Sequence, residues 1–282
     1  MEIQNGMGLL VEYLALSDGA DRVERSGTLA RGLTILQVVA QAPQPLSLAE
    51  IATAASLDQS TTHRLLKTLE ETQYVVKIGA TRRYCASPNL LHPLPLLHPL
   101  DQLRREAAPA LKELSLRLRL TTILVVFVGA ERLVLDIALV PGSLTPYYST
   151  WLKGPMHATA GGKALLVGMT EAQRASLIGL GPFDACTPQT LTDSRALNDD
   201  LQRSAARGYV VSHDEHRQGV TNLSAPISRW TGGAAGCLIA SSPSSDIDDE
   251  RIAAVGLELK RASELLVYQA PSLEAASRFC GH

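Results

Sequence analysis

The sequence predicts an α+β protein of two domains, in which a small helical domain precedes a larger domain whose antiparallel sheet is flanked by helices. A chain of 282 residues suffices for roughly two domains of ordinary size. Helical periodicity dominates up to residue 72, whereas strands, then helices, then strands follow residue 120, an order typical of α+β folds. Prolines interleaved with leucines over residues 86–99 indicate the boundary. We therefore predict an extension (1–25), a first domain (26–87), a linker (88–108) and a second domain (109–282).

The composition favours a globular protein of the cytoplasm. Hydrophobic residues make up 45% of the chain, and the formal net charge is only −2. No apolar run approaches the roughly 20 residues that span a bilayer, and the residues after Met1 lack the positive region of a secretory signal. The four cysteines lie far apart, so neither a disulfide framework nor a zinc motif is indicated. We expect reduced cysteines, no cofactor, no bound metal and no membrane partner.

The first domain begins with a helix that two prolines end. Apolar residues recur from Thr28 onward at spacings of three and four, which places them on one helical face. They are Leu29, Leu33, Leu36 and Val39. Pro43 and Pro45 then stop the pattern, because proline lacks the amide that a helix interior requires.

Two further helices and a hairpin follow. Ser47 and Glu50 have the spacing of a capping box, which predicts a short helix over residues 48–55. Asp58 or a near neighbour can cap a third helix that extends to about Thr72. Strands over residues 74–78 and 82–85, joined by a turn at 79–80, predict a two-stranded hairpin. This order of elements indicates a winged helix-turn-helix, a DNA-binding fold.

The third helix has one apolar face and one polar face. At 100° per residue, its apolar residues fall on a single stripe that comprises Thr62, Leu65, Leu66 and Leu69. The opposite face and the first turn provide polar or basic side chains, and the wing adds two arginines. The predicted DNA-contacting residues are Gln59, Ser60, Thr61, His63, Arg64, Lys67, Arg82 and Arg83. A polar helix face is usually only solvated, but the ordered set of elements around this one favours DNA contact.

The second domain alternates blocks of strands and helices. The pattern predicts a helix over 101–120, which we expect Pro109 to break into a linker helix and the first helix of the domain. Strands are expected over 121–128 and 132–140, helices over 158–168, 170–179 and 193–207, strands over 209–213, 221–228 and 235–241, and a final helix over 247–268. Together these elements predict an antiparallel sheet flanked by helices.

Enzyme and metal functions have weak support. In the segment from His213 to His216, strand alternation places His213 and Glu215 on one face, and no distant partner completes a metal site. Lys163 follows two glycines but lacks the spacing of a phosphate-binding loop, and no nucleophile-elbow pattern occurs. We therefore expect no catalytic residues. A small-molecule-binding or enzymatic domain whose amino-terminal helices contact only protein remains the alternative.

Several motifs in a fixed order resemble the IclR family of bacterial transcriptional regulators. In the first domain they lie at residues 31–36, 46–52 and 60–69, and in the second at 155–164, 187–190, 215–220 and 225–227. The resemblance extends over about residues 26–270. Ser56 and Gln73 depart from it, since each occupies a position where the family usually has glycine at a helix end. The proline-rich linker is also atypical.

The resemblance implies a GAF-like second domain that binds a small organic acid, with an aromatic acid as one option. The implied effector-binding residues are Met156, Ala160, Gly161, Ser212, Asp214, Asn222 and Ser241. Backbone amides at Ala160 and Gly161 would suit a carboxylate. Asn222 stands where many members have cysteine, and Ile239 where serine is common, so a ligand with a different polar edge is expected.

Aromatic residues and oligomerisation complete the expectations for this domain. Tyr147, Tyr148 and Trp151 could line the pocket for an aromatic acid, although a dimer contact or core packing explains them equally well. The implied partners are double-stranded operator DNA, a small-molecule effector and further copies of the chain. Because such operators are commonly near-palindromic, we expect a homodimer or a dimer of dimers.

Overall fold

The computed structural model describes residues 27–79, 82–91, 97–140, 152–228 and 233–280. The chain divides into two compact units between Pro95 and Leu96, inside the predicted linker 88–108, and each unit is described separately. The predicted extension 1–25 and the aromatic residues Tyr147, Tyr148 and Trp151 lie outside the described residues. Within the described residues, no helix combines the length and the apolar character that crossing a membrane requires.

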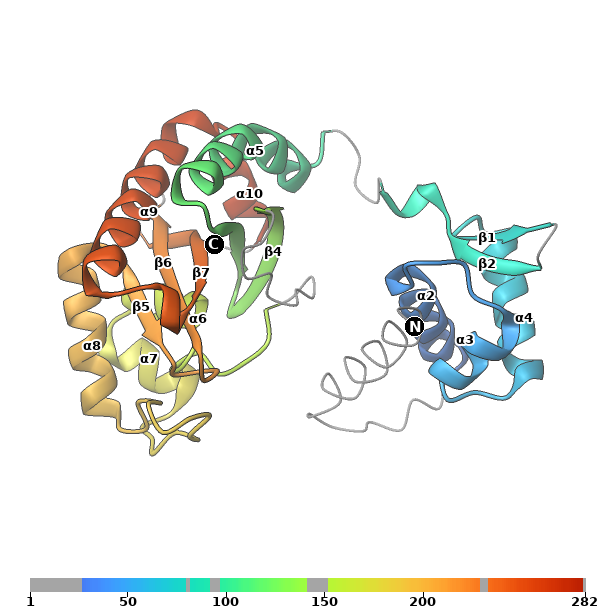
Figure 1. Ribbon diagram of the computed structural model, residues 1–282, viewed down its shortest axis with the longest axis horizontal. Coiled ribbons are helices and arrows are strands. Elements are labelled where there is room, and N and C mark those ends of the chain that lie inside the picture. Colours follow the sequence, from blue (N-terminus) through green and yellow to red (C-terminus); the bar gives the residue numbers. More distant parts are fainter. Residues whose placement is uncertain (1–26, 80–81, 92–96, 141–151, 229–232, 281–282) are drawn as a thin grey trace. The chain divides into compact units, whose positions relative to one another are not determined.

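Within its described residues, the first unit contains three α-helices and a hairpin (Figure 1). Its elements are α2 (Thr28–Gln41), α3 (Leu48–Ala54), α4 (Gln59–Glu71), β1 (Val75–Ile78), β2 (Arg83–Ala86) and the 3-10 helix η1 (Pro88–Leu91). The two strands pair antiparallel, and an isolated bridge joins Leu46 to Tyr84. The predicted winged helix-turn-helix is therefore confirmed.

Local signals set the helix ends of this unit. Ser47 and Glu50 form the predicted capping box, since each side chain bonds the other's backbone amide. The Asp58 carboxylate accepts the amide of Thr61 at 2.8 Å and so caps α4. The three helices then enclose a core that includes Ile35, Ile51 and Leu66, each of which is fully buried.

The two positions that depart from glycine adopt the conformation that glycine favours. Ser56, in the turn between α3 and α4, has a φ of 54°, and Gln73, after α4, has a φ of 63°. A β-carbon makes this left-handed region costly. The turns of the fold are therefore retained in this chain at the expense of backbone strain at Ser56 and Gln73.

The second unit is built on a five-stranded antiparallel sheet with strand order β4-β3-β7-β6-β5. The strands are β3 (Thr121–Val128), β4 (Glu131–Ala138), β5 (Val210–His213), β6 (Val220–Ser228) and β7 (Ala234–Pro243). The helices are α5 (Pro99–Leu118), α6 (Ala160–Val167), α7 (Glu171–Ile178), α8 (Ser194–Arg207), η2 (Ser244–Asp246), α9 (Asp249–Gln269) and α10 (Leu273–Phe279). This confirms the predicted α+β fold.

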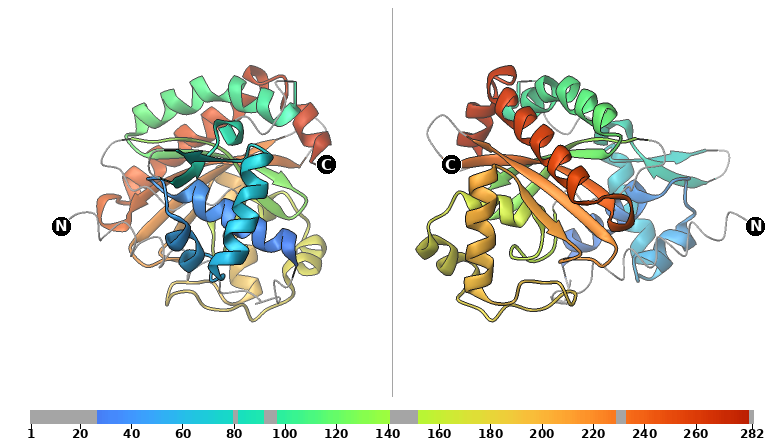
Figure 2. Two further views of the ribbon diagram at one scale, coloured as in Figure 1. Left: turned by 90° about the vertical axis from the view of Figure 1, so that its right-hand side faces the viewer. Right: turned by 60° about the vertical axis from the view of Figure 1, so that its left-hand side comes forward.

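Helices cover both faces of the sheet (Figures 1 and 2). Alternation along β3 sends Leu124 and Val126 towards α5 and α9, whereas Val125 and Phe127 face α6. We call the second side the α6 face; β4, β5, β6 and β7 also contribute to it. Helices α7 and α8 pack beside α6 around the buried Leu166 and Leu201.

The predicted break at Pro109 is wrong. Helix α5 is continuous from Pro99 to Leu118 and contains Pro109 in its interior. A proline there costs about 3 kcal/mol, but Ala107 before it and Leu111 after it are both buried in the same core. Packing of this face therefore offsets the local preference. The short α10, which follows Pro271, was not predicted because its seven residues carry too little periodicity.

Candidate functional site

Helix α4 is the helix that the sequence predicts to contact DNA. Its first turn is ordered by Asp58, which also accepts the Ser60 hydroxyl at 2.7 Å, and these hydrogen bonds hold the pKa of the Asp58 carboxyl far below its usual value. Thr62, Leu65 and Leu66 are buried, as the predicted stripe requires. The orientation of the helix about its axis is thereby fixed.

The opposite side of α4 is exposed. Gln59, Ser60, His63, Arg64 and Lys67 are all exposed, and Thr61 is half-buried. Lys67 Nζ lies 3.8 Å from Glu71 Oε1, an exposed i,i+4 pair of little energetic weight. The face therefore combines hydroxyl, amide, imidazole and cationic groups, which can address both base edges and phosphates.

The two wing arginines differ in their surroundings. Arg83 Nη1 donates to the carbonyl of Pro45 at 2.7 Å and lies 3.2 Å from Glu50 Oε2, so its guanidinium ties β2 to the start of α3. Arg82 is exposed, with a φ of 52°, and has no hydrogen bond or ion pair to the described residues. Of the two, Arg82 has the guanidinium without a partner among the described residues, and DNA contact by either arginine stays a prediction.

Three of the predicted effector residues meet on the α6 face. Asn222 and Ser241 are opposite each other on β6 and β7, and Ser241 Oγ donates to Asn222 Oδ1 at 2.6 Å. Ser212 on β5 pairs with Asn222 in the sheet, and its hydroxyl donates to the carbonyl of Ala158 at 2.7 Å. These polar groups therefore adjoin the start of α6.

The start of α6 adds the next three residues. Ala160 and Gly161 are buried in the first turn, and Met156 packs against the apolar cluster of this face. Ser224 reinforces the junction, because its hydroxyl donates to the carbonyl of Ala160 at 2.8 Å. Six of the seven predicted effector residues thus belong to one side of the sheet.

Asp214 does not join them. It follows β5 with a φ of 56°, and its Oδ1 accepts the hydroxyl of Ser244 at 2.6 Å, which together with nearby His213 lowers the pKa of its carboxyl. Ser244 also contacts Thr221, the neighbour of Asn222 on β6 whose side chain points to the other face. The Asp214 carboxylate therefore lies apart from Asn222 and Ser241.

The positive φ of Asp214 also overturns the predicted alternation from His213 to His216. His213 Nδ1 lies 2.7 Å from Thr221 Oγ1, whereas Glu215 turns towards α6 and lies 2.6 Å from Lys163 Nζ. The placement of His213 and Glu215 on one face is wrong because the strand ends at His213. A reversal of this kind carries no periodic signal in the sequence.

A buried ion cluster was likewise not predicted, because no periodic pattern in the sequence connects its members. Lys163 on α6 is fully buried, and its Nζ also lies 3.0 Å from Asp200 Oδ2 on α8. Burial raises the pKa of Glu215 to about 7, with the nearby Asp200 charge acting in the same direction and Lys163 opposing it. The cluster joins α6, α8 and the segment after β5.

Arg132 on β4 is a second residue that sequence reasoning missed. It is 5% exposed, and its side chain reaches the residues that precede α6. Val134, two residues further along β4, points to the same side of the strand and belongs to the apolar cluster of the α6 face. A basic residue at an inward position of a strand was the available signal.

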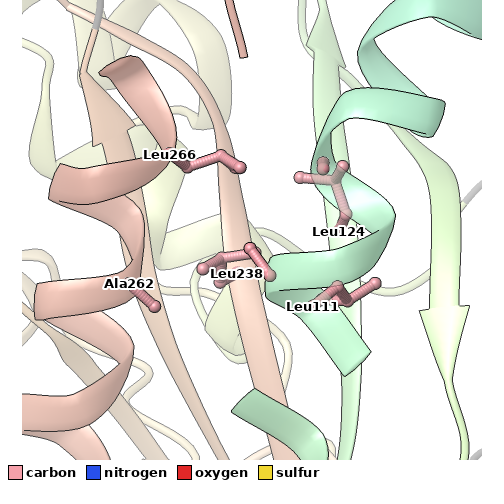
Figure 3. A pocket seen from close by; sticks show the side chains of 7 residues that line it. Leu111, Leu124, Leu238, Ala262 and Leu266 are labelled. Carbon is pink, nitrogen blue, oxygen red and sulfur yellow. The ribbon is translucent and has the colours of Figure 1, made fainter. Parts of the chain in front are cut away.

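A small cavity lies on the opposite side of the sheet, between α5 and α9 (Figure 3). Its lining is entirely apolar and comprises Ala107, Ala110, Leu111, Leu124, Leu238, Ala262 and Leu266. The figure shows Leu111 and Leu124 on one side of Leu238, with Ala262 and Leu266 of α9 on the other. Its lining offers no polar side chain that would orient an acid, and none of the predicted effector residues contributes to it.

Two family models match this chain. The IclR helix-turn-helix domain matches residues 28–79, and the model of the bacterial transcriptional regulator IclR C-terminal domain matches residues 97–267. The acetate operon repressor of Salmonella typhimurium is 29% identical over 241 residues, which cover 84% of this chain and 88% of that protein. The transcriptional repressor AllR of Escherichia coli is 27% identical, with 91% and 95% covered.

Solved structures show the same fold. The crystal structure of IclR from Thermotoga maritima matches with a TM-score of 0.71 and 23% identity, covering 90% of this chain and 99% of that one. An IclR homologue from Microbacterium hydrocarbonoxydans, complexed with 4-hydroxybenzoate, matches with a TM-score of 0.67 and 21% identity, covering 90% and 100%. With both domain models matched in order along the described helix-turn-helix and sheet, the chain belongs to the IclR family of bacterial transcriptional regulators.

Proposed function

We propose that this regulator binds a specific operator in double-stranded DNA through the exposed face of α4. The observation that carries the proposal is the division of α4 into a buried stripe and an exposed polar face that includes Arg64 and Lys67. A recognition helix needs both, because the stripe fixes its orientation while the polar side chains reach base edges and phosphates. Arg82 at the wing supplies a further phosphate contact.

The protein acts in this proposal as a homodimer or a dimer of dimers in the cytoplasm, without a catalytic role. Two-fold symmetry would match a near-palindromic operator. Helix α2 supports self-association of the first unit, because Leu29 is 76% exposed and Leu33 is 51% exposed on its surface. Large apolar side chains exposed together on one helix favour a protein contact.

A small organic acid modulates operator binding in this proposal. The α6 face brings Asn222 and Ser241 next to the first turn of α6, where backbone amides favour a negative charge. The Microbacterium homologue, which was solved with 4-hydroxybenzoate, makes an aromatic acid one option for this chain. Six of the predicted residues support this site, and Asp214 is left out of it.

Binding to the promoter beside the protein's own gene tests the proposal. Fluorescence anisotropy at moderate salt would compare that promoter with random duplex of equal length, before and after organic acids are added. We expect tighter binding to the promoter and a shift of its affinity by an effective acid. Equal affinity for the promoter and for random duplex would exclude the specific regulator and leave the protein-contact alternative.

The assignment of Asn222 to the effector site is tested separately. A thermal-shift screen of small acids, repeated with Asn222→Ala, would compare the increase in the unfolding temperature that each acid causes. We expect the variant to lose part of that increase. An unchanged response would remove Asn222 from the site.

A further inference from the structure

Arg132 is a buried cation whose charge is not matched by an acidic side chain. Its side chain is 5% exposed, and no carboxylate of the described residues forms an ion pair with it. The adjacent Glu131 is exposed and, by strand alternation, points to the other side of β4. A guanidinium in such a position carries a large desolvation cost unless a partner compensates the charge.

The neighbouring titratable groups do not supply that partner. Cys237 on β7 is fully buried, and burial raises the pKa of its thiol to about 12, so it is neutral at pH 7. Burial, and then the positive charges of Arg217 and Arg132, lower the pKa of His216 and keep this imidazole neutral as well. Among the described residues, Arg132 therefore holds a buried positive charge that no carboxylate pairs with, while the charges of Arg217 and Glu131 nearby are exposed.

Two of the three guanidinium nitrogens are directed to the backbone that leads into α6. Nη1 donates to Thr159 Oγ1 at 2.7 Å, and Nη2 donates to the carbonyl of Gly154 at 2.7 Å. The third, Nε, is buried and has no hydrogen-bond partner in the part of the chain that the structure describes. A buried donor without an acceptor costs about 1–3 kcal/mol, so an incoming acceptor would be stabilised here.

The amino terminus of α6 adds further donors at the same place. Thr159 caps this helix by accepting the amide of Gly162, and the same hydroxyl oxygen accepts the hydrogen bond from Arg132. The amides of Ala160 and Gly161 have no acceptor within the helix, because the first turn lacks preceding carbonyls. The guanidinium of Arg132 and the positive end of the α6 dipole therefore lie together at the amino terminus of α6.

We propose that Arg132, with the first turn of α6, binds the carboxylate of an anionic effector with one negative charge. This inference rests on the proposed effector function and identifies the group that would make the effector an acid. One positive charge matches a monocarboxylate, whereas a phosphate dianion would leave a second buried charge uncompensated. The free Nε donor and the amides offer the charge-assisted hydrogen bonds that a carboxylate accepts.

The side chains around Arg132 also indicate the chemical character of the rest of the ligand. Leu152, Met156 and Ile239 belong to the apolar cluster beside this point, so the body of the ligand would be apolar or aromatic. A β-carbon on Gly161 would lie 3.2 Å from Ile239 Cδ1 and 3.5 Å from Leu152 Cδ1. It would also lie 3.9 Å from Arg132 Cδ, so these three side chains pack closely around the first turn of α6 and leave no room for a β-carbon unless Ile239 moves.

Thermal unfolding of the full chain with matched probes tests the inference. The probes are benzoate and acetate, their neutral counterparts benzamide and acetamide, and inorganic phosphate. We expect one or both carboxylates to raise the unfolding temperature of the wild type, with little response to the amides or to phosphate. Arg132→Met would weaken carboxylate binding roughly 10- to 100-fold, the loss expected for a charge-assisted hydrogen bond. Arg132→Lys, which retains the charge, would keep part of the response.

Two further measurements do not depend on the folding of Arg132→Met. In the wild type labelled with ¹⁵N, the side-chain Nε–H resonance that Arg132→Lys lacks should shift on addition of the carboxylate. Gly161→Ala should weaken carboxylate binding without changing any charge. A wild type that ignores both carboxylates, an equal response to carboxylates and amides, or an undiminished response in Arg132→Met and Gly161→Ala would overturn the inference.

The inference and the proposed function can fail separately. Carboxylate binding that depends on Arg132, in a protein without preference for any operator, would refute the DNA-binding regulator and keep the anion site. Specific operator binding together with a normal acid response in Arg132→Met would refute the anion site and keep the regulator.

Discussion

Lys163 Nζ lies 2.6 Å from the carboxylate of Glu215, and the two side chains are 0% and 10% exposed. Asp200 is the third member of this cluster, 3.0 Å from the same Nζ. Two carboxylates thus share one ammonium in a buried position, which leaves a net negative charge when all three groups are ionised. Burial and the charge of Asp200 raise the pKa of Glu215 from 4.5 to about 7.

The raised pKa of Glu215 predicts that stability falls as the pH rises. Between pH 4.5 and about 7 the native state binds more protons at Glu215 than the unfolded state, so the free energy of unfolding decreases over this window. Glu215 contributes up to about 3 kcal/mol to the free energy of unfolding. This contribution is fully present below pH 4.5, the pKa of the group in the unfolded chain, and it is lost above about pH 7, its pKa in the folded protein. Urea denaturation of wild type and Glu215→Gln at several pH values measures it. Glu215→Gln should show a flatter profile across this window; a difference between the two proteins that does not vary with pH would contradict the assignment.

Removal of the ammonium is predicted to be more damaging than removal of one carboxylate. Lys163→Met removes the ammonium that Asp200 and Glu215 share and leaves Asp200 only its 3.4 Å ion pair with the exposed Arg203. Breaking a buried pair in this way costs about 3–5 kcal/mol. Lys153→Met is the matched control, because Lys153 is exposed. Denaturation midpoints at pH 7 would compare the two variants. Similar midpoints for both would show that the cluster does not stabilise the fold.

Glycine at the two strained turns is predicted to stabilise the first unit. Ser56 and Gln73 have φ values of 54° and 63°, where a β-carbon costs about 1–2 kcal/mol. Because glycine also gains entropy in the unfolded chain, Ser56→Gly and Gln73→Gly should each add up to about 1 kcal/mol. Ala55→Gly is the control, since Ala55 has a φ of −83° and should lose stability instead. Equal effects of all three substitutions on the free energy of unfolding would refute the strain.

The two wing arginines are predicted to have separable effects. Arg83→Ala removes the bond to the Pro45 carbonyl and the contact with Glu50, so it should destabilise the first unit by about 1 kcal/mol. Arg82→Ala should weaken DNA binding and leave the unfolding temperature unchanged. Thermal unfolding and DNA titrations of both variants test the distinction. Loss of DNA affinity in Arg83→Ala at full stability would contradict this separation and indicate that Arg83 itself contacts DNA.

The sequence predicts the elements that short-range signals determine. The Ser47–Glu50 capping box, the Asp58 cap and the β-branched run of β3 each lie within one element, and the structure has helices or strands at these places. Pro109 shows the limit of local signals, because burial of α5 on both sides of it outweighs its helix-breaking tendency. The spacing of residues along the sequence does not reveal tertiary packing of this kind.

The candidate site was predicted only in part because its charges interact over long separations. Lys163 is 37 residues from Asp200 and 52 from Glu215, and no periodic pattern connects them. The left-handed backbone of Asp214 turned its carboxylate away from the α6 face and Glu215 towards it. Arg132 lies on β4, outside every motif that resembles the family, so no motif indicated it.

The salt dependence of operator binding by variants of α4 tests the central claim most directly. Affinity for operator and for random duplex would be measured over a range of salt for wild type, Arg64→Ala, Lys67→Ala and the control Lys112→Ala, whose lysine is exposed on α5. We predict that Arg64→Ala and Lys67→Ala weaken operator binding, that loss of a phosphate contact lowers the slope of log affinity against log salt by about 1, and that Lys112→Ala matches the wild type. Unchanged operator affinity and salt slope in both α4 variants would contradict the assignment of α4 as the DNA-reading helix.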